Sequence, residues 1–245
     1  MLRRLLTGSI GMAIVAASLA VVPVVAVNGG ACAQPFDPVI ALAEFTTAGQ
    51  PNPIVNPYFP LRPGTTFVYD GTLAGLPQHV VTTVTATIRT IDGIPSLEVR
   101  DTLWLAGLLA EDTLDWYAQD DGGNVWYFGE DTKEYDANGN VISTAGSWLA
   151  GVNGAAPGIL VEAQPRGGDT FRQEFAAGVA EDMASVMSLT KHVTVPFGSF
   201  DRVVETKEFS CIEAGLEHKF YAPGVGNVLV VAKGERLELV SVTGP

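Results

Sequence analysis

The sequence predicts one mainly β domain, an antiparallel sheet curled into a half-barrel or a closed barrel. From residue 65 onward, runs rich in Val, Ile, Thr and aromatic residues alternate apolar and polar positions, which is the period of a half-buried strand. Turn-forming residues separate these runs at intervals typical of hairpins and not of strand–helix–strand units. A large antiparallel sheet cannot stay flat, so the sheet is expected to curl around an enclosed space.

The expected strands follow the apolar runs along the chain, and their connections carry turn residues. The strands are 65–69, 80–90, 96–104, 113–119, 125–128, 193–195, 203–209, 217–221, 228–231 and 237–242. The turns are 70–71, 92–93, 120–124, 138–140, 196–198, 213–215, 223–224 and 233–234. The glycine-rich stretch 146–168 is expected to be the longest loop. Residues 175–187 fit helical as well as strand spacing, and a strand is favoured for 183–189.

Residues 1–33 are typical of a signal peptide. Two arginines precede an apolar stretch over 5–27, and Ala31-Cys32-Ala33 matches the A-x-A cleavage rule, which would make Gln34 the first mature residue. Two alternatives stay open, namely a lipid attached to Cys32 or retention of the apolar stretch as a membrane anchor. Cleavage is favoured, so the protein is expected to be secreted or periplasmic, without a membrane span in the mature chain.

The mature chain is expected to begin with an irregular arm, residues 34–64, that lies over a β domain formed by residues 65–245. Seven prolines fall between Pro35 and Pro63, and they favour extended backbone. Within the arm, residues 37–45 predict a short helix with Pro38 at its first position. After cleavage behind Ala33, Cys211 would be the only cysteine, interpreted as a small buried hydrophobe in a strand.

Composition excludes several function classes. The net charge of −13 argues against a nucleic-acid partner. No phosphate-binding loop, dinucleotide fingerprint or nucleophile elbow is present, and the histidines at 79, 192 and 218 have no zinc-binding spacing. No cofactor and no metal site is therefore predicted. Twelve carboxylates lie between Asp92 and Asp136 and are interpreted as a solvated acidic face, while residues 136–140 are interpreted as a hairpin turn and not as a calcium loop.

Four short turn-and-strand motifs carry a resemblance to known proteins. They are Asn56-Pro57-Tyr58-Phe59-Pro60-Leu61, Pro63-Gly64-Thr65-Thr66-Phe67-Val68-Tyr69, the turn over 195–200, and Tyr221-Ala222-Pro223-Gly224-Val225-Gly226. With them, the chain resembles uncharacterised secreted bacterial proteins of unknown function, distantly like the half-barrel lipoproteins related to periplasmic lipoprotein carriers. The resemblance implies a fold and a compartment, and no catalytic residues.

The candidate site lies on an aromatic hairpin over residues 115–130. Strand alternation puts Asp115, Tyr117 and Gln119 on one face, and on the return strand it groups Trp126, Phe128 and Glu130. One interpretation is cross-strand aromatic packing. The other is a ligand-binding wall formed by Trp104, Trp116, Trp126, Phe128, Glu130 and His218.

The favoured function is a non-catalytic module that binds an apolar or amphipathic small molecule inside the sheet. The first alternative is a barrel-type hydrolase or isomerase, which would use His218 or a carboxylate pair such as Asp115 and Glu130. His218 would then need a carboxylate from another strand: Glu130, Glu181, Glu205 or Glu208. The second alternative is an acidic surface that captures a partner. Ligand identity, catalysis and oligomeric state stay open at this stage.

Overall fold

The structure is a computed structural model that describes residues 29–245, and residues 1–28 of the predicted signal peptide lie outside the described part. In chain order its elements are α1 (Gly29–Cys32), η1 (Leu42–Glu44), β1 (Thr46–Thr47), β2 (Gln50–Pro51), β3 (Thr66–Leu73), β4 (Leu76–Ile91), β5 (Ile94–Leu105), β6 (Leu108–Gln119), β7 (Val125–Tyr135), β8 (Val141–Ser143), β9 (Trp148–Leu149), β10 (Ala156–Val161), β11 (Thr170–Arg172), β12 (Glu174–Phe175), β13 (Asp182–Val195), β14 (Gly198–Ser210), β15 (Glu217–Ala222), β16 (Gly226–Ala232) and β17 (Glu235–Thr243). None of the helices in this part has the length and apolar character needed to cross a bilayer.

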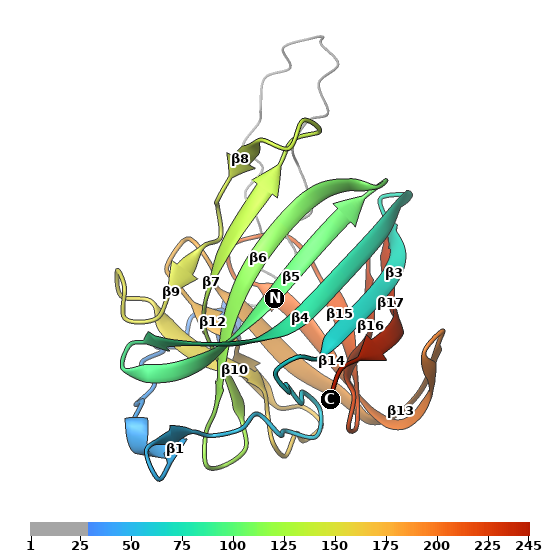
Figure 1. The fold of residues 1–245 in the computed structure, drawn as a ribbon. Coiled ribbons are helices and arrows are strands. Elements are labelled where there is room, and N and C mark those ends of the chain that lie inside the picture. Colours follow the sequence, from blue (N-terminus) through green and yellow to red (C-terminus); the bar gives the residue numbers. More distant parts are fainter. Residues whose placement is uncertain (1–28) are drawn as a thin grey trace.

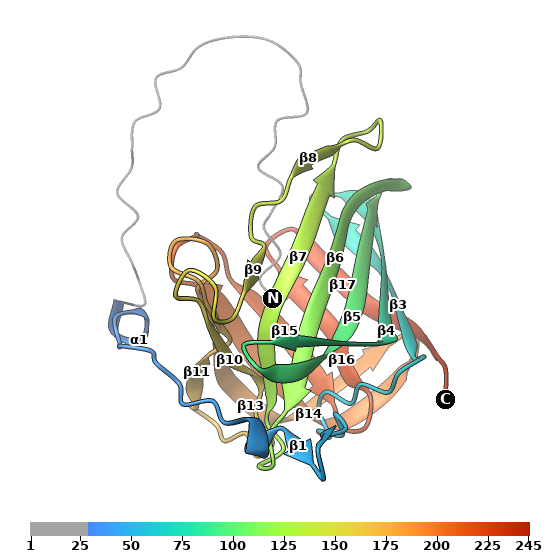
Figure 2. The ribbon, with the colours of Figure 1, turned by 60° about the vertical axis from the view of Figure 1, so that its left-hand side comes forward.

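One antiparallel sheet of 15 strands curls into a nearly closed barrel (Figures 1 and 2). Its strand order is β11-β13-β14-β15-β16-β17-β3-β4-β5-β6-β7-β10-β12, and β8 and β9 pair with β7 beside this path. β1 and β2 form a separate ribbon. The prediction of a mainly β, curled antiparallel sheet is confirmed.

The barrel has one unsealed seam, between the β13 side and the β10 side of the sheet. The chain segment that carries β11 and β12 lies along it, since β11 pairs with β13 while β12 pairs with β10. Between them, the buried Gln173 donates its backbone N–H to the carbonyl oxygen of Asp182 and its side-chain amide to that of Leu160. Hydrogen bonds from one residue therefore span the seam.

Two glycine-based predictions were wrong because these glycines permit close approach of strands. Gly71 lies inside β3 and not in a turn. A Cβ at this position would overlap the carbonyl oxygen of Arg236 on β17, so the glycine lets β17 come close. Residues 146–168 are not one loop, because they contain β9 and β10. Gly158 of β10 has the same role, since its Cβ would overlap the carbonyl oxygen of Arg172. The strand expected over 183–189 is confirmed as part of β13.

The proline-rich arm runs along the outside of the barrel and then across one end of it (Figures 1 and 2). The helix predicted over 37–45 is wrong, since only the single turn of η1 forms. Its expected apolar face has little to pack against: Val39 is 90% exposed and Leu42 52% exposed. A short helix gains its stability from such packing. Within 37–45 only Phe45 is buried, edge-on against Trp126 and Phe128 on the outer face of β7.

A disulfide joins Cys32 at the end of α1 to Cys211, 179 residues further along the chain. Cys211 therefore is not a buried hydrophobe within a strand; it lies in the loop after β14. A sulfur atom in a disulfide cannot also carry a thioether-linked lipid, so lipid attachment at Cys32 is disfavoured. Cleavage after Ala33, as expected from the sequence, would remove Cys32 and with it this disulfide.

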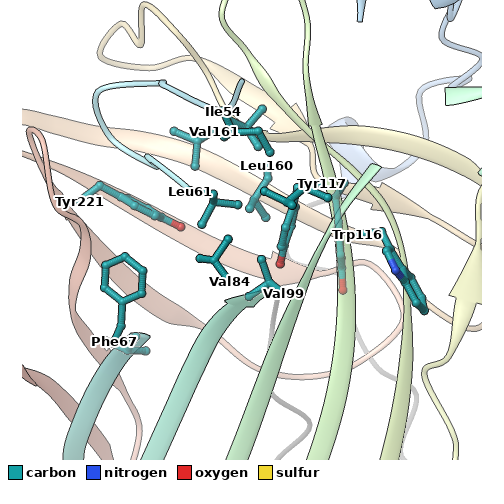
Figure 3. Packing of buried hydrophobic residues seen from close by; sticks show 14 of the residues in the cluster. Ile54, Leu61, Phe67, Val84, Val99, Trp116, Tyr117, Leu160, Val161 and Tyr221 are labelled. Atoms are coloured by element: carbon teal, nitrogen blue, oxygen red, sulfur yellow. The ribbon is translucent and has the colours of Figure 1, made fainter. Parts of the chain in front are cut away.

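The apolar core lies inside the barrel. Ile54 and Leu61 of the arm enter it and pack with residues that project inward from the strands, among them Val84, Val99 and Tyr221 (Figure 3). Figure 3 also shows Tyr117 and Trp116 of β6 projecting to opposite sides of their strand. The inward positions of β6 therefore continue from this core toward Asp115.

Candidate functional site

A cavity of about 120 Å³ lies inside the barrel and adjoins the apolar core. Among the residues that the structure describes, five aromatic and four charged side chains line it. The aromatic residues are Phe59, Phe67, Tyr69, Tyr117 and Tyr221; the charged ones are Asp101, Asp115, Glu217 and Lys219. Convergent polar groups in an otherwise apolar cavity are typical of a small-molecule site.

A β-bulge brings Asp115 and Glu130 together. On β7 the extra residue is Phe128, which has no partner on β6, while the next residue, Gly129, pairs with Trp116. Tyr127 therefore pairs with Tyr117, and Glu130 pairs with Asp115. Simple alternation would put Glu130 on the outward face of the sheet, together with Phe128. Because of the extra residue, Glu130 instead shares the inward face with Tyr127. The Tyr127 hydroxyl lies 2.6 Å from Asp115 Oδ1 and 3.2 Å from Glu130 Oε2.

Both carboxyl groups hold their protons unusually tightly. Burial raises the pKa of Asp115 to about 7, although the hydrogen bond from Tyr127 opposes this shift. Burial, together with the negative charges of Glu174 and Asp115, raises the pKa of Glu130 well above its usual range. The Tyr127 hydroxyl has one proton to donate, and it donates this proton to Asp115, the closer of the two carboxyl groups. A protonated Glu130 can donate its own proton to the same phenol oxygen.

A second polar group surrounds Lys219 of β15. Its ammonium lies 2.7 Å from Glu208 Oε2 and 3.0 Å from Glu217 Oε1, and the Tyr221 hydroxyl donates to Glu208 at 3.1 Å. Burial alone would raise the pKa of Glu208, but the charge and hydrogen bond of Lys219 hold it at about 2. Two carboxyl groups thus lie against the ammonium that lines the cavity.

A third buried carboxyl, Glu174 of β12, accepts a hydrogen bond of 2.7 Å from the indole nitrogen of Trp148. Burial, followed by the charge of Asp182, raises its pKa to about 8. Within residues 29–245, no three His, Cys, Asp or Glu side chains are placed to hold a metal ion.

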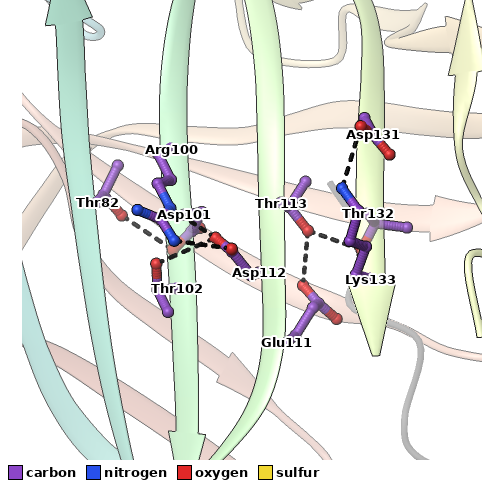
Figure 4. Close-up of polar contacts among 10 residues, drawn as sticks. All are labelled: Thr82, Arg100, Asp101, Thr102, Glu111, Asp112, Thr113, Asp131, Thr132 and Lys133. Atoms are coloured by element: carbon purple, nitrogen blue, oxygen red, sulfur yellow. Dashed lines mark hydrogen bonds and ion pairs between the residues drawn. The ribbon is translucent and has the colours of Figure 1, made fainter. Parts of the chain in front are cut away.

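The acidic segment between Asp92 and Asp136 does not form one solvated face, which corrects the sequence interpretation. Alternation along β5, β6 and β7 divides its carboxylates between the two faces of the sheet (Figure 4). On the outer face, Arg100 binds Asp112 through two contacts of 2.7 and 2.8 Å, which lower the pKa of Asp112. The inner face carries Asp101, Glu111, Asp115 and Glu130. At 136–140, the Asp136 carboxylate accepts backbone N–H bonds from Asn138 and Asn140 in a hairpin turn.

The six residues expected to form a ligand wall occupy several places. Trp104 lies on the outer face of β5 beside His79, with ring centroids 5.5 Å apart. His218 lies on the outer face of β15, where its Nδ1 is 2.9 Å from Glu205. Glu205 was one of the four partners expected for it, and it also binds Lys191.

Trp126 and Phe128 lie under the arm, where they pack on Phe45. The structure does bring Trp116 and Glu130 to one place, a second cavity of about 370 Å³ at the edge of β7. Trp116 is buried there beneath the guanidinium of Arg89, 4.4 Å from the ring centroid. Sequence reasoning missed Lys219 as a site residue, although alternation over 217–221 groups it with Tyr221.

Comparison with known proteins identifies no family. No protein-family model matches the chain, and no curated protein matches it. Two solved structures are similar in part. One is a protein from Bacteroides fragilis described as exported, with a YmcC-like fold: TM-score 0.44 and 16% identity over 76% of this chain and 98% of that one. The other is described as a lipoprotein from Parabacteroides distasonis: TM-score 0.40 and 13% identity, with the same coverage.

Proposed function

We propose that the chain is an exported, non-catalytic binding protein that holds an amphipathic small molecule inside its barrel. The cavity carries this proposal, because aromatic side chains and buried charged groups converge on one space. Export is supported by the signal-peptide pattern of residues 1–33 and by the disulfide, since disulfides persist in oxidising compartments.

The size of the cavity limits the part of the ligand that it can enclose. An engineered apolar cavity of about 150 Å³ is known to bind benzene. The cavity of about 120 Å³ in the barrel therefore suits a single ring or a short alkyl chain. Polar side chains, among them Asp115 and Tyr221, interrupt the apolar wall, so that a polar substituent on the ligand can be bound.

Native mass spectrometry of the protein purified from an exporting host tests this function. We expect a bound molecule of low mass, released by organic solvent. Val80 lines the cavity, whereas its neighbour Val81 points to the outer face of β4. Val80→Phe should abolish the bound mass and Val81→Phe should preserve it, with circular dichroism confirming that both variants fold. Equal occupancy in the two variants, or no bound mass in the parent protein, would exclude the proposed site.

A second candidate function is acid–base catalysis by Asp115 and Glu130. The observation that favours it is their shared contact with Tyr127, combined with pKa values that burial raises above the usual range of carboxyl groups. A screen of ester, glycoside and isomerase substrates tests it. Activity that survives His218→Asn and is lost in Asp115→Asn and Glu130→Gln would support catalysis by this pair. Activity retained in Asp115→Asn would exclude it.

A further inference from the structure

We infer that the barrel selects an amphipathic molecule with a positively charged amine, and that Asp115 binds this amine while the aromatic side chains enclose the apolar part. The inference rests on the proposed function, and it adds the sign of the ligand's charge. Three features of the cavity support it: the balance of charges, the hydrogen bonding of Asp115 and the aromatic wall.

The balance of charges disfavours an anionic ligand. Among the described side chains that line the cavity, the carboxyl groups of Asp101, Asp115 and Glu217 stand against the ammonium of Lys219. That ammonium already has Glu208 and Glu217 within 3.0 Å. A ligand carboxylate would have to displace one of these charge-assisted bonds, and it would meet the negative charge of the displaced group.

Asp115 offers the amine a carboxyl oxygen that accepts no hydrogen bond from a described residue. Its side chain is only 3% exposed, and Tyr127 donates to Oδ1. Among the residues that the structure describes, no donor reaches the second oxygen, Oδ2. A buried carboxylate with an unpaired oxygen is costly, because water no longer solvates it. An ammonium that lies against Oδ2 would form a charge-assisted hydrogen bond and offset this cost.

The aromatic wall suits the same ligand. Phe59, which comes from the arm, packs edge-on against Tyr117 at 5.5 Å and against Tyr221 at 6.5 Å. The faces of such rings attract cations as well as apolar groups. The cavity therefore combines an apolar wall with a negative group, which matches an aryl or short alkyl amine.

Three probes that share a phenyl ring and differ in charge test the effect of ligand charge on binding: phenethylamine, 2-phenylethanol and phenylacetate. Isothermal titration calorimetry at pH 7.5 should give a dissociation constant at least tenfold lower for phenethylamine than for 2-phenylethanol, and no detectable binding of phenylacetate. Asp115→Asn keeps the shape of the side chain and removes its charge. This variant should bind phenethylamine and 2-phenylethanol with dissociation constants within about threefold of each other.

Asp70→Asn is the matched control, because it removes one charge from a carboxylate on the outer face of β3, where Asp70 binds His79. It should keep the full preference for the amine. Asp101→Asn is a second cavity variant in case Asp115→Asn does not fold, and it should weaken the amine preference. If all three probes bind equally, or if phenylacetate binds best, the charge inference fails and the binding function stands. If none binds, both proposals fail.

Discussion

Asp115 and Glu130 face each other across β6 and β7, and both contact the phenol oxygen of one tyrosine, Tyr127. Two buried carboxyl groups in this arrangement cannot both lose their protons without strong repulsion. They therefore titrate as a pair, and at neutral pH at least one of them keeps its proton. Burial favours the neutral form of these two carboxyl groups, which makes the stability of the barrel depend on pH.

The first prediction concerns the free energy of unfolding between pH 5 and pH 8. The pKa of Asp115 is raised to about 7 and that of Glu174 to about 8 in the folded chain, above the unfolded value of about 4. The folded chain therefore binds more protons over this range, and its stability falls as the pH rises, by up to about 1.4 kcal/mol per pH unit for each group. Urea unfolding at several pH values measures this slope.

Asp115→Asn with Glu174→Gln should flatten the slope, whereas the outer-face variant Asp70→Asn should leave it unchanged. An unaltered slope in the double variant would show that these groups do not titrate as described. The contribution of Glu208 to stability depends on pH with the opposite sign. Because its pKa lies near 2, below the unfolded value, its contribution to stability is lost only when the pH falls below about 4.

The second prediction concerns the disulfide between Cys32 and Cys211. Because both sulfur atoms belong to the folded chain, signal cleavage should occur before Cys32, so that the mature protein retains this residue. Mass spectrometry of the exported protein should place its first residue at or before Cys32. Treatment with a reductant should then add two hydrogen atoms to the intact mass.

Cys211→Ser should lower the free energy of unfolding by about 2–5 kcal/mol, because the closed loop is long and its opening frees the unfolded chain. Reduction of the parent protein with dithiothreitol should have the same effect, and should not affect the variant. A chain that begins at Gln34, with a free Cys211 thiol, would contradict this prediction.

The third prediction concerns the glycine at the bulge of β7. Gly129 has a φ of +145°, and a Cβ there would lie 2.5 Å from the carbonyl oxygen of Trp148. Gly129→Ala should therefore destabilise the protein by about 1–3 kcal/mol and displace Glu130 from Tyr127. Gly167→Ala is the control, since a Cβ there would meet no atom of the described residues within 4 Å, apart from its own chain neighbours. Thermal unfolding should separate the two variants, and equal melting temperatures would contradict the role of the bulge.

The fourth prediction concerns the attachment of the arm. Phe45 is 1% exposed and packs on the outer face of β7, so Phe45→Ala should cost about 3–5 kcal/mol of stability. The exposed Val39, which lies nearer to α1 along the arm, should tolerate Val39→Ala with a change below about 0.5 kcal/mol. Limited proteolysis within residues 34–64 should accelerate in the first variant only. Similar cleavage rates would show that Phe45 does not anchor the arm.

The sequence predicted the fold well because strand alternation and turn chemistry are local signals. The turn at Asp92-Gly93 formed as expected, with Ile91 paired to Ile94. Gly71 and Gly158 could not be interpreted correctly in the same way, since the strands that approach them, near Arg236 and Arg172, come from other parts of the chain. A glycine that serves a turn and one that admits a neighbouring strand have the same sequence signature.

The candidate site was predicted less completely, for a similar reason. Alternation placed Asp115 and Tyr117 on one face correctly, but it failed at Glu130, because one extra residue in a bulge reverses every later side chain. The aromatic residues that drew attention in the sequence include Trp126, which the arm covers. The pairing of Cys32 with Cys211 depends on contacts across the whole chain and has no local signal.

The seam of the barrel has a consequence for self-association. An open sheet normally offers unpaired backbone groups that can template the addition of a strand from another molecule. Here β11 is three residues long and β12 two, and both belong to one segment joined by the buried Gln173. At β11 and β12, an incoming strand would therefore find only two or three residues of backbone in line. Where β13 continues beyond β11, register shifts between Val186 and Val193 break the regular course of the strand, and such irregularities also discourage the addition of a strand from another molecule.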